Sequence, residues 1–321
     1  MLAHTVSTLV GLFQARVAQS ADQEVWRTKR QGVWVPTTWQ QLSDRVDAVA
    51  AGLAELGLAR GDAVAILGGT NPSWVVADLA ALSLGASTVG IYETLVRDQI
   101  AFILQDSGAR ILFVQGAESF ARVRPLLDEI EGLEHVVVWG HIPEDDDAVT
   151  TLDALTERGQ AALAKAADTL DAQRAAVAPD DLALIVYTSG TTGQPKGVPL
   201  RHGQIVGWMA ATQHMLAEPM TTDDITMSFL PMAHVAEHVP GLFGRMNVGL
   251  RTAYATSYDT LLDELQEIRP TYFGAVPRIF EKMHGRILER VAQANPRRQA
   301  IFQWAADLAR RPGPAGAPRG G

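Results

Sequence analysis

The chain has 321 residues, 47% of them hydrophobic, which is enough for a packed core spread over about two domains. Its formal net charge of −9 argues against a nucleic-acid-binding protein, because such proteins need a basic patch or stripe. No cysteine is present, which excludes disulfides and thiolate chemistry and is compatible with a cytoplasmic protein.

Helical and strand patterns alternate over the first 140 residues. This alternation predicts a mostly parallel sheet covered by helices. The first helix is expected to begin after Thr38 as its N-cap. An acidic run at 144–147 follows the last of these strands and is interpreted as a solvated loop, because consecutive carboxylates point in different directions. The expected elements are helix 38–58, strand 63–67, helix 73–84, strand 86–91, helix 97–105, strand 111–114, helix 117–130 and strand 135–139.

The next expected strand, at 182–186, leads into the run YTSGTTGQPKGV at residues 187–198. Its glycines let backbone N–H groups approach phosphate oxygens, its hydroxyls add neutral donors, and Lys196 adds a mobile positive charge. It is not a Walker A loop, because Pro195 precedes the lysine and Gly197 follows it. A simple surface turn needs neither neighbouring hydroxyls nor a lysine, so the run predicts a polyphosphate-binding loop. The predicted phosphate-binding residues are Thr188, Ser189, Gly190, Thr191, Thr192, Gly193 and Lys196.

A second α/β unit is expected after this loop. Its last strand would place a small residue at 274–277 on a ligand-binding edge, and the alternative is a strand-to-helix turn with Pro277 at the first helical position. The Pro/Gly-rich end at 312–321 cannot bury a core and is expected to be a disordered tail behind one domain at 1–311. The expected elements are helix 203–216, strand 226–230, helix 235–247, strand 252–254, helix 258–268, strand 271–275 and helix 278–294.

The loop at 187–198 is similar to the phosphate-binding signature of the adenylate-forming superfamily, which includes acyl-CoA synthetases, nonribosomal peptide adenylation domains and luciferases. The segments NPSW at 71–74, IYET at 91–94, LPMAHVAEH at 230–238 and VPRIFEK at 276–282 resemble long-chain acyl-CoA synthetases. They occur in family order between roughly residues 30 and 310, so the resemblance covers most of the chain.

The resemblance implies two interleaved α/β subdomains with mostly parallel sheets flanked by helices, the second built from both the start and the end of the chain. The Tyr-Gly-x-Thr-Glu and Thr-Gly-Asp segments of the family do not follow, and the family β-barrel and C-terminal lid have no sequence here. The chain is therefore interpreted as the N-terminal half of a synthetase, with a missing C-terminal half.

The implied activity is that of a long-chain fatty acid–CoA ligase. ATP would adenylate a fatty acid and coenzyme A would then form the thioester, with Mg²⁺ on the phosphates, although the usual glutamate ligand of the metal lies in the absent part. No metal ligand is assigned in this chain. Two alternatives stay open: an adenylating enzyme for another carboxylic acid, and a non-catalytic or weakly nucleotide-binding fragment. No signal peptide or membrane span is expected, while peripheral membrane contact stays open.

His234 follows a Leu-Pro turn, where the resemblance implies a residue that lines the carboxylate and acyl site. Glu237 lies three residues later and is expected to share a helical face with His234 and to orient it. Both are predicted as catalytic residues. Long-chain synthetases commonly show Ser-His-x-Phe-Glu-Arg here, so Ala233, Ala236 and His238 remove a hydroxyl, an aromatic ring and a guanidinium.

Overall fold

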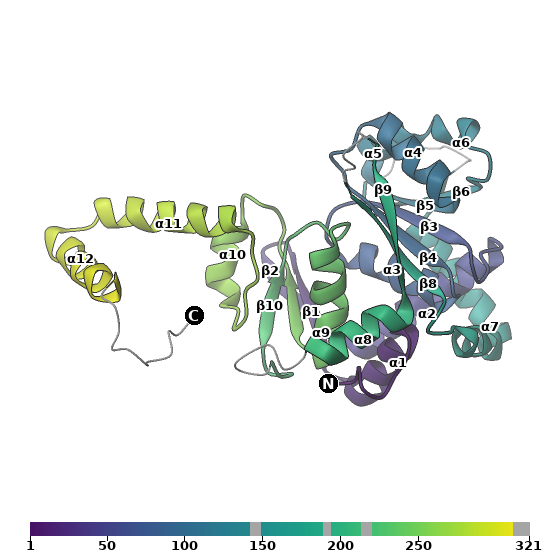
Figure 1. The fold of residues 1–321 in the computed structure, drawn as a ribbon, viewed down its shortest axis with the longest axis horizontal. Helices are drawn as coiled ribbons and strands as arrows, with labels where there is room; N and C mark the ends of the chain where they lie inside the picture. Colours follow the sequence, from purple (N-terminus) through teal and green to yellow (C-terminus); the bar gives the residue numbers. More distant parts are fainter. Residues whose placement is uncertain (142–148, 189–193, 213–219, 311–321) are drawn as a thin grey trace. The chain divides into compact units, whose positions relative to one another are not determined.

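The computed structural model describes residues 1–141, 149–188, 194–212 and 220–310. The chain divides into two compact units, Met1–Phe273 and Gly274–Gly321. The first unit contains two sheets and their helices, and the described part of the second contains two helices (Figure 1). The acidic run at 144–147 and the Pro/Gly-rich end at 312–321 lie outside the described residues.

The larger sheet has seven strands in the order β7-β6-β5-β3-β4-β8-β9. Six strands are parallel, and only β9 runs antiparallel, beside β8. The predicted parallel sheet is confirmed. Its strands are β3 (Ala63–Leu67), β4 (Ser87–Ile91), β5 (Ala109–Gln115), β6 (His135–Trp139), β7 (Val149–Thr151), β8 (Leu182–Thr188) and β9 (Lys196–Arg201).

Helices cover both faces of this sheet, because alternate residues of a strand point to opposite faces. In β3, Val64 and Ile66 join a core built with α1, α2, α3 and α7, whereas Ala65 and Leu67 join a second core with α4 and α5. All five residues of β3 are buried, as expected for the centre of a parallel sheet. The helices are α1 (Leu9–Ser20), α2 (Trp39–Glu55), α3 (Pro72–Ser83), α4 (Arg97–Ser107), α5 (Gly116–Val123), α6 (Leu126–Glu129), α7 (Leu152–Ala176) and α8 (His202–Thr212).

Local sequence explains several of the helix boundaries. Thr38 accepts from the backbone N–H of Gln41, and the Gln41 side chain accepts in return from the N–H of Thr38, so the predicted N-cap is confirmed as a capping box. The single helix expected at 117–130 was wrong: α5 and α6 are separated at Pro125, which has no N–H to donate.

The smaller sheet has the order β10-β11-β1-β2 and joins segments far apart in the sequence. Its two early strands form a hairpin through Gln31 and Gly32, which have φ values of 49° and 81°. β1 pairs in parallel with β11, so early and late segments of the first unit build this subdomain, whereas the prediction had also included the end of the chain, which belongs to the second unit. The strands are β1 (Glu24–Arg30), β2 (Val33–Thr38), β10 (Ile225–Ser228) and β11 (Arg251–Tyr254).

Three shorter helical segments follow in this subdomain. The helix expected at 235–247 is a π-helix, η1 (Glu237–Phe243), that continues into α9 (Gly244–Val248). Pro240 lies inside η1 and lacks the N–H that a regular α-helix would use there. α10 (Leu261–Ile268) completes the set.

The strand expected at 271–275 was wrong. Thr271 binds the first residue of β10 through its side chain and its backbone: its Oγ1 accepts from the N–H of Ile225 at 3.0 Å, and its own N–H donates to the Ile225 carbonyl at 2.9 Å. The Thr271 hydroxyl thus accepts from the Ile225 N–H, which a further strand would otherwise have bound. The small residue at 274–277 therefore does not end a strand, and the alternative of a helix start is confirmed.

The second unit, described through residue 310, consists of α11 (Pro277–Ala292) and α12 (Pro296–Arg310). Pro277 occupies the first turn of α11, where a missing N–H costs nothing. Among the residues that the structure describes, no helix combines the length and the apolar character needed to cross a bilayer.

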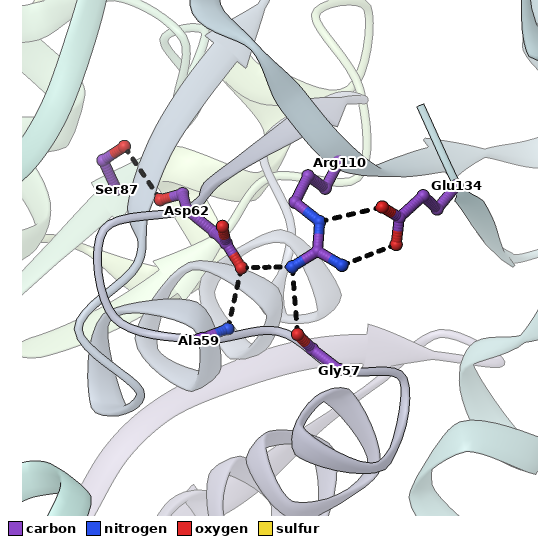
Figure 2. A network of polar contacts seen from close by, with 6 residues as sticks. All are labelled: Gly57, Ala59, Asp62, Ser87, Arg110 and Glu134. Carbon is purple, nitrogen blue, oxygen red and sulfur yellow. Dashed lines mark hydrogen bonds and ion pairs between the residues drawn. The ribbon is translucent and has the colours of Figure 1, made fainter. Parts of the chain in front are cut away.

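The amino ends of the parallel strands are joined by a network around Arg110 (Figure 2). Its guanidinium donates to Asp62 before β3 at 2.5 Å, to Glu134 before β6 at 2.6 Å, and to the carbonyl of Gly57 after α2 at 3.0 Å. Asp62 also accepts from the N–H of Ala59 at 2.8 Å. These hydrogen bonds raise the pKa of Arg110 and lower the pKa of Glu134. The charged side chains of this network therefore pair with one another at the amino ends of the strands.

Candidate functional site

The carboxyl ends of the parallel strands define the candidate site. β3 connects to β4 through α3, and β4 connects back across β3 to β5 through α4. Since α3 and α4 pack in opposite cores, the chain leaves β3 and β4 toward opposite faces of the sheet. Open α/β sheets bind ligands at such a switch point, outside the carboxyl ends of the strands.

The turn after β3 brings the backbone close to other groups at this edge. The Gln115 side-chain oxygen, at the end of β5, accepts from the N–H of Gly69 at 2.8 Å and from the Asn71 amide at 3.0 Å. A Cβ on Gly69 would lie 3.1 Å from a carboxylate oxygen of Glu93, which follows β4. Sequence reasoning gave Gln115 and Glu93 no role, because no motif marks a residue that meets the turn only across the sheet.

The predicted phosphate loop connects β8 to β9. Thr188 and Lys196 are ladder partners at its two ends, and both are exposed. Lys196 makes no ion pair within the described part of the chain. The loop starts from the carboxyl end of β8, two strands from β3 in the sheet. Five of the predicted residues lie outside the described residues: Ser189, Gly190, Thr191, Thr192 and Gly193.

The stem of this hairpin is anchored just before the loop. The hydroxyl of Tyr187 donates to Asp106 on α4 at 2.6 Å. Burial raises the pKa of Tyr187, and the neighbouring Asp106 carboxylate raises it further, so the phenol keeps its proton. Gly197 lies over the same ring, since a Cβ there would approach Tyr187 and Ile185 to 3.1 Å.

The turn that carries His234 is held against the same edge of the sheet. Thr70, after β3, donates its hydroxyl to the carbonyl of Leu230 at 2.5 Å. A Cβ on Gly90 of β4 would lie only 2.7 Å from Cα of Ala233, so the turn contacts the strand backbone directly. The His234 side chain is exposed, and its Nδ1 accepts from the N–H of Ala236 at 3.0 Å.

Glu237 does not orient His234 through a direct side-chain contact. Its buried carboxylate accepts from the hydroxyl of Ser228 at 2.5 Å and from Arg245 at 2.6 Å. The expectation of a shared α-helical face was wrong because Glu237 begins the π-helix, whereas His234 lies in the turn before it. The catalytic roles of both residues stay predictions.

His238 stands where long-chain synthetases commonly show an arginine, and its surroundings are buried. His238 Nε2 lies 3.1 Å from the carboxylate of Asp78, and both side chains are buried. The imidazole also contacts Trp74 edge-on and stacks on Phe243, with ring centroids 4.9 and 5.3 Å away. Arg245, seven residues further along in α9, binds Glu237 through its guanidinium.

Two other features of the described residues bear on ligand binding. Within the described residues, no group of three or more histidine or acidic side chains could hold a metal ion. A hollow at the amino edge is bordered by Arg60 and Asp181, which bind each other at 2.8 Å and leave no free charge for a ligand.

Comparison with protein families finds that the AMP-binding enzyme model matches residues 13–310. The rat long-chain-fatty-acid–CoA ligase ACSBG2 is 32% identical over 310 residues, which are 94% of this chain and 46% of that protein. The Mycobacterium bovis long-chain-fatty-acid–CoA ligase FadD15 is 33% identical over 292 residues, covering 90% of this chain and 46% of its own. The chain thus spans less than half the length of these relatives.

Solved structures show the same fold. The inhibitor-bound N-terminal domain of FACL13 from Mycobacterium tuberculosis aligns with a TM-score of 0.67 and 26% identity, over 86% of this chain and 64% of that one. The anthranilate CoA ligase AuaEII, solved with anthranoyl-AMP, aligns with a TM-score of 0.69 over 83% of this chain and 49% of that one. Its 22% identity supports the fold alone. The expected α/β fold of two interleaved subdomains is therefore confirmed.

Proposed function

Because this chain belongs to the AMP-binding enzyme family, we propose that it forms the ATP- and fatty-acid-binding part of an AMP-forming long-chain fatty acid–CoA ligase. The observation that carries the proposal is the hairpin loop between Thr188 and Lys196, at the sheet edge that also holds the His234 turn. Relatives at about 32% identity named as long-chain-fatty-acid–CoA ligases support the substrate class.

The reaction has two steps. A fatty-acid carboxylate oxygen attacks the α-phosphorus of ATP, which forms the acyl adenylate and releases pyrophosphate. The thiol of coenzyme A then attacks the acyl carbonyl carbon, and AMP leaves. Catalysis of the first step depends mainly on positioning and on neutralising charge.

The residues of this chain take definite roles in that scheme. The loop hydroxyls and backbone N–H groups bind the β- and γ-phosphates, and Lys196 neutralises charge as pyrophosphate leaves. His234 directs its Nε2–H toward the carboxylate of the acid. Mg²⁺ is part of the proposal through the family only.

The test is ATP–pyrophosphate exchange by the purified chain with a long-chain fatty acid, together with ATP binding by calorimetry. Lys196→Ala is expected to weaken ATP binding about 10- to 100-fold, the loss of one charge-assisted contact of about 1.5–3 kcal/mol. Lys165→Ala, on the exposed surface of α7, is the matched control and should bind ATP as the wild type does. Equal ATP affinity in Lys196→Ala and the wild type would remove the loop assignment.

The second candidate is a nucleotide-binding fragment without activity, and it is favoured by the chain's spanning only 46% of its relatives. ATP binding without exchange would support it. Exchange with an aryl or amino acid but with no fatty acid would instead support an adenylating enzyme for another carboxylic acid.

The proposal includes a cytoplasmic location. It also includes peripheral contact with membranes, because long-chain fatty acids partition into bilayers. Co-sedimentation with vesicles of neutral and of anionic lipid tests the membrane contact, and recovery of all protein in the supernatant would contradict it.

A further inference from the structure

Three hydrogen bonds join His234 to the residues that follow it. Its Nδ1 accepts from the N–H of Ala236, and its carbonyl oxygen accepts from the N–H groups of Glu237 and His238, each at 3.0 Å. Because Nδ1 accepts, a neutral imidazole must carry its proton on Nε2. The orientation of the ring therefore depends on where residues 236–238 are held.

The first of two buried pairs holds Glu237. Its carboxylate is bound by Arg245 of α9 and by Ser228 of β10, elements of the four-stranded subdomain. The side chains of Arg245 and Glu237 are only 10% and 6% exposed. A buried carboxylate of this kind keeps its place only while its partner neutralises it.

The second buried pair holds His238 from the other subdomain. Asp78 of α3 accepts from Thr88 of β4 at 2.6 Å and lies 3.1 Å from Nε2 of His238. An Nε2–H on His238 would donate to this carboxylate, which also accepts from Thr88. Glu237 and His238 follow each other in the chain and are thus bound from two different subdomains, through α9 and α3.

We propose that Arg245 and Asp78 are positioning residues that fix the ring and the tautomer of His234. Arg245 acts through Glu237 and Asp78 acts through His238, and neither side chain needs to touch the substrate. The role of His234 toward the acid rests on the proposed function, whereas the fixed orientation of its ring does not. Together the two pairs keep the proton on Nε2 of the exposed His234 ring.

The test reads the ring nitrogens of His234 by ¹⁵N NMR in the full chain without ligand, with the resonances assigned by comparison with His234→Gln. The wild type should show one tautomer with the proton on Nε2. Arg245→Met should lose this signature and show a mixture of tautomers, while Arg245→Lys, which keeps a buried cation, should retain most of it.

Arg110→Met is the matched control, because it also removes an arginine bound to carboxylates but acts at the opposite edge of the sheet. It should leave the His234 signature unchanged even where it lowers stability, which separates positioning from general destabilisation. A folded Arg245→Met with the wild-type signature would overturn the role of Arg245.

Two double variants cover the case in which a lone buried charge prevents folding. Arg245→Met/Glu237→Met and Asp78→Leu/His238→Phe each replace a whole pair by apolar groups, which buried sites often tolerate. Each should lose the single tautomer, and an unchanged signature in either folded double variant would overturn the role of that pair. Failure of ATP binding in the wild type would remove the proposed function and leave these spectra unaffected.

Discussion

The two arginine networks of the first unit use similar distances in different surroundings. Arg110 contacts Asp62 at 2.5 Å and Glu134 at 2.6 Å, with side chains 29%, 23% and 44% exposed. Arg245 contacts Glu237 at 2.6 Å with side chains 10% and 6% exposed. Water can replace a lost partner in the first network but not in the second. Burial, and not hydrogen-bond length, therefore decides which of the two contacts matters more for stability.

The largest expected effect comes from breaking the buried pair. Arg245→Met should lower the free energy of unfolding by about 3–5 kcal/mol, because it leaves the Glu237 carboxylate buried and unpaired. Urea denaturation at neutral pH measures this. The double variant with Glu237→Met should recover most of the loss, and a single-variant loss below about 1 kcal/mol would mean that water reaches Glu237.

His202 is buried near the amino edge of the large sheet. It tests whether burial, and not position at one edge of the sheet, decides how strongly a group affects stability. Burial lowers the pKa of His202 to about 4 from 6.5, although Asp181 and Asp78 oppose the shift. The unfolded chain then binds more protons between these pH values, so stability rises with pH through this window and is fully present above pH 6.5. The contribution is about 3 kcal/mol, lost as pH falls toward 4.

Replacing the histidine isolates this effect. His202→Asn keeps an acceptor near Nδ1, which binds the N–H of Leu9, and removes the titration. Thermal unfolding between pH 4 and 7 should show a shallower pH dependence in the variant. A variant as pH-sensitive as the wild type would assign the dependence to other groups.

Two substitutions in one strand compare the two edges of the sheet. Gly90→Ala, at the carboxyl end of β4, forces a Cβ against the backbone of Ala233 and should cost about 1–3 kcal/mol. Ser87→Ala, at the amino end, removes only a 3.3 Å contact to Asp62 and should cost less than about 0.5 kcal/mol. Denaturant midpoints measure both, and equal costs would contradict the close approach at Gly90.

A smaller loss than that of Gly90→Ala is expected for an arginine in the exposed network. Arg110→Met should cost about 1 kcal/mol, because its carboxylate partners stay hydrated. The loss of stability in this variant should be smaller in 1 M salt than in 0.1 M salt, since salt screens exposed charges. The loss from Arg245→Met should change little with salt. A stronger salt dependence for Arg245→Met than for Arg110→Met would contradict the comparison.

Strands of continuous apolar residues were predicted well, because a central strand needs little beyond its own sequence to be recognised. β3 and β6 were predicted with their observed boundaries. No element was predicted at α7, whose packing depends on close backbone approach: a Cβ on Gly159 would lie 1.7 Å from the carbonyl of Ala48 in α2. A close contact between two backbones does not produce a hydrophobic periodicity in the sequence, so it gave no signal for α7.

By itself, the sequence determined the kind of fold and the place of the loop that is predicted to bind phosphate, because apolar strands and a run of glycine, hydroxyl and lysine are local signals. Only the tertiary structure decided the partners of the residues around His234. Asp78 and His238 are 160 positions apart, and Arg245 binds Glu237 through a π-helix that no α-helical pattern predicts. Side-chain pairs between distant segments are set by the packing of the two subdomains, which residue spacing along the chain does not encode.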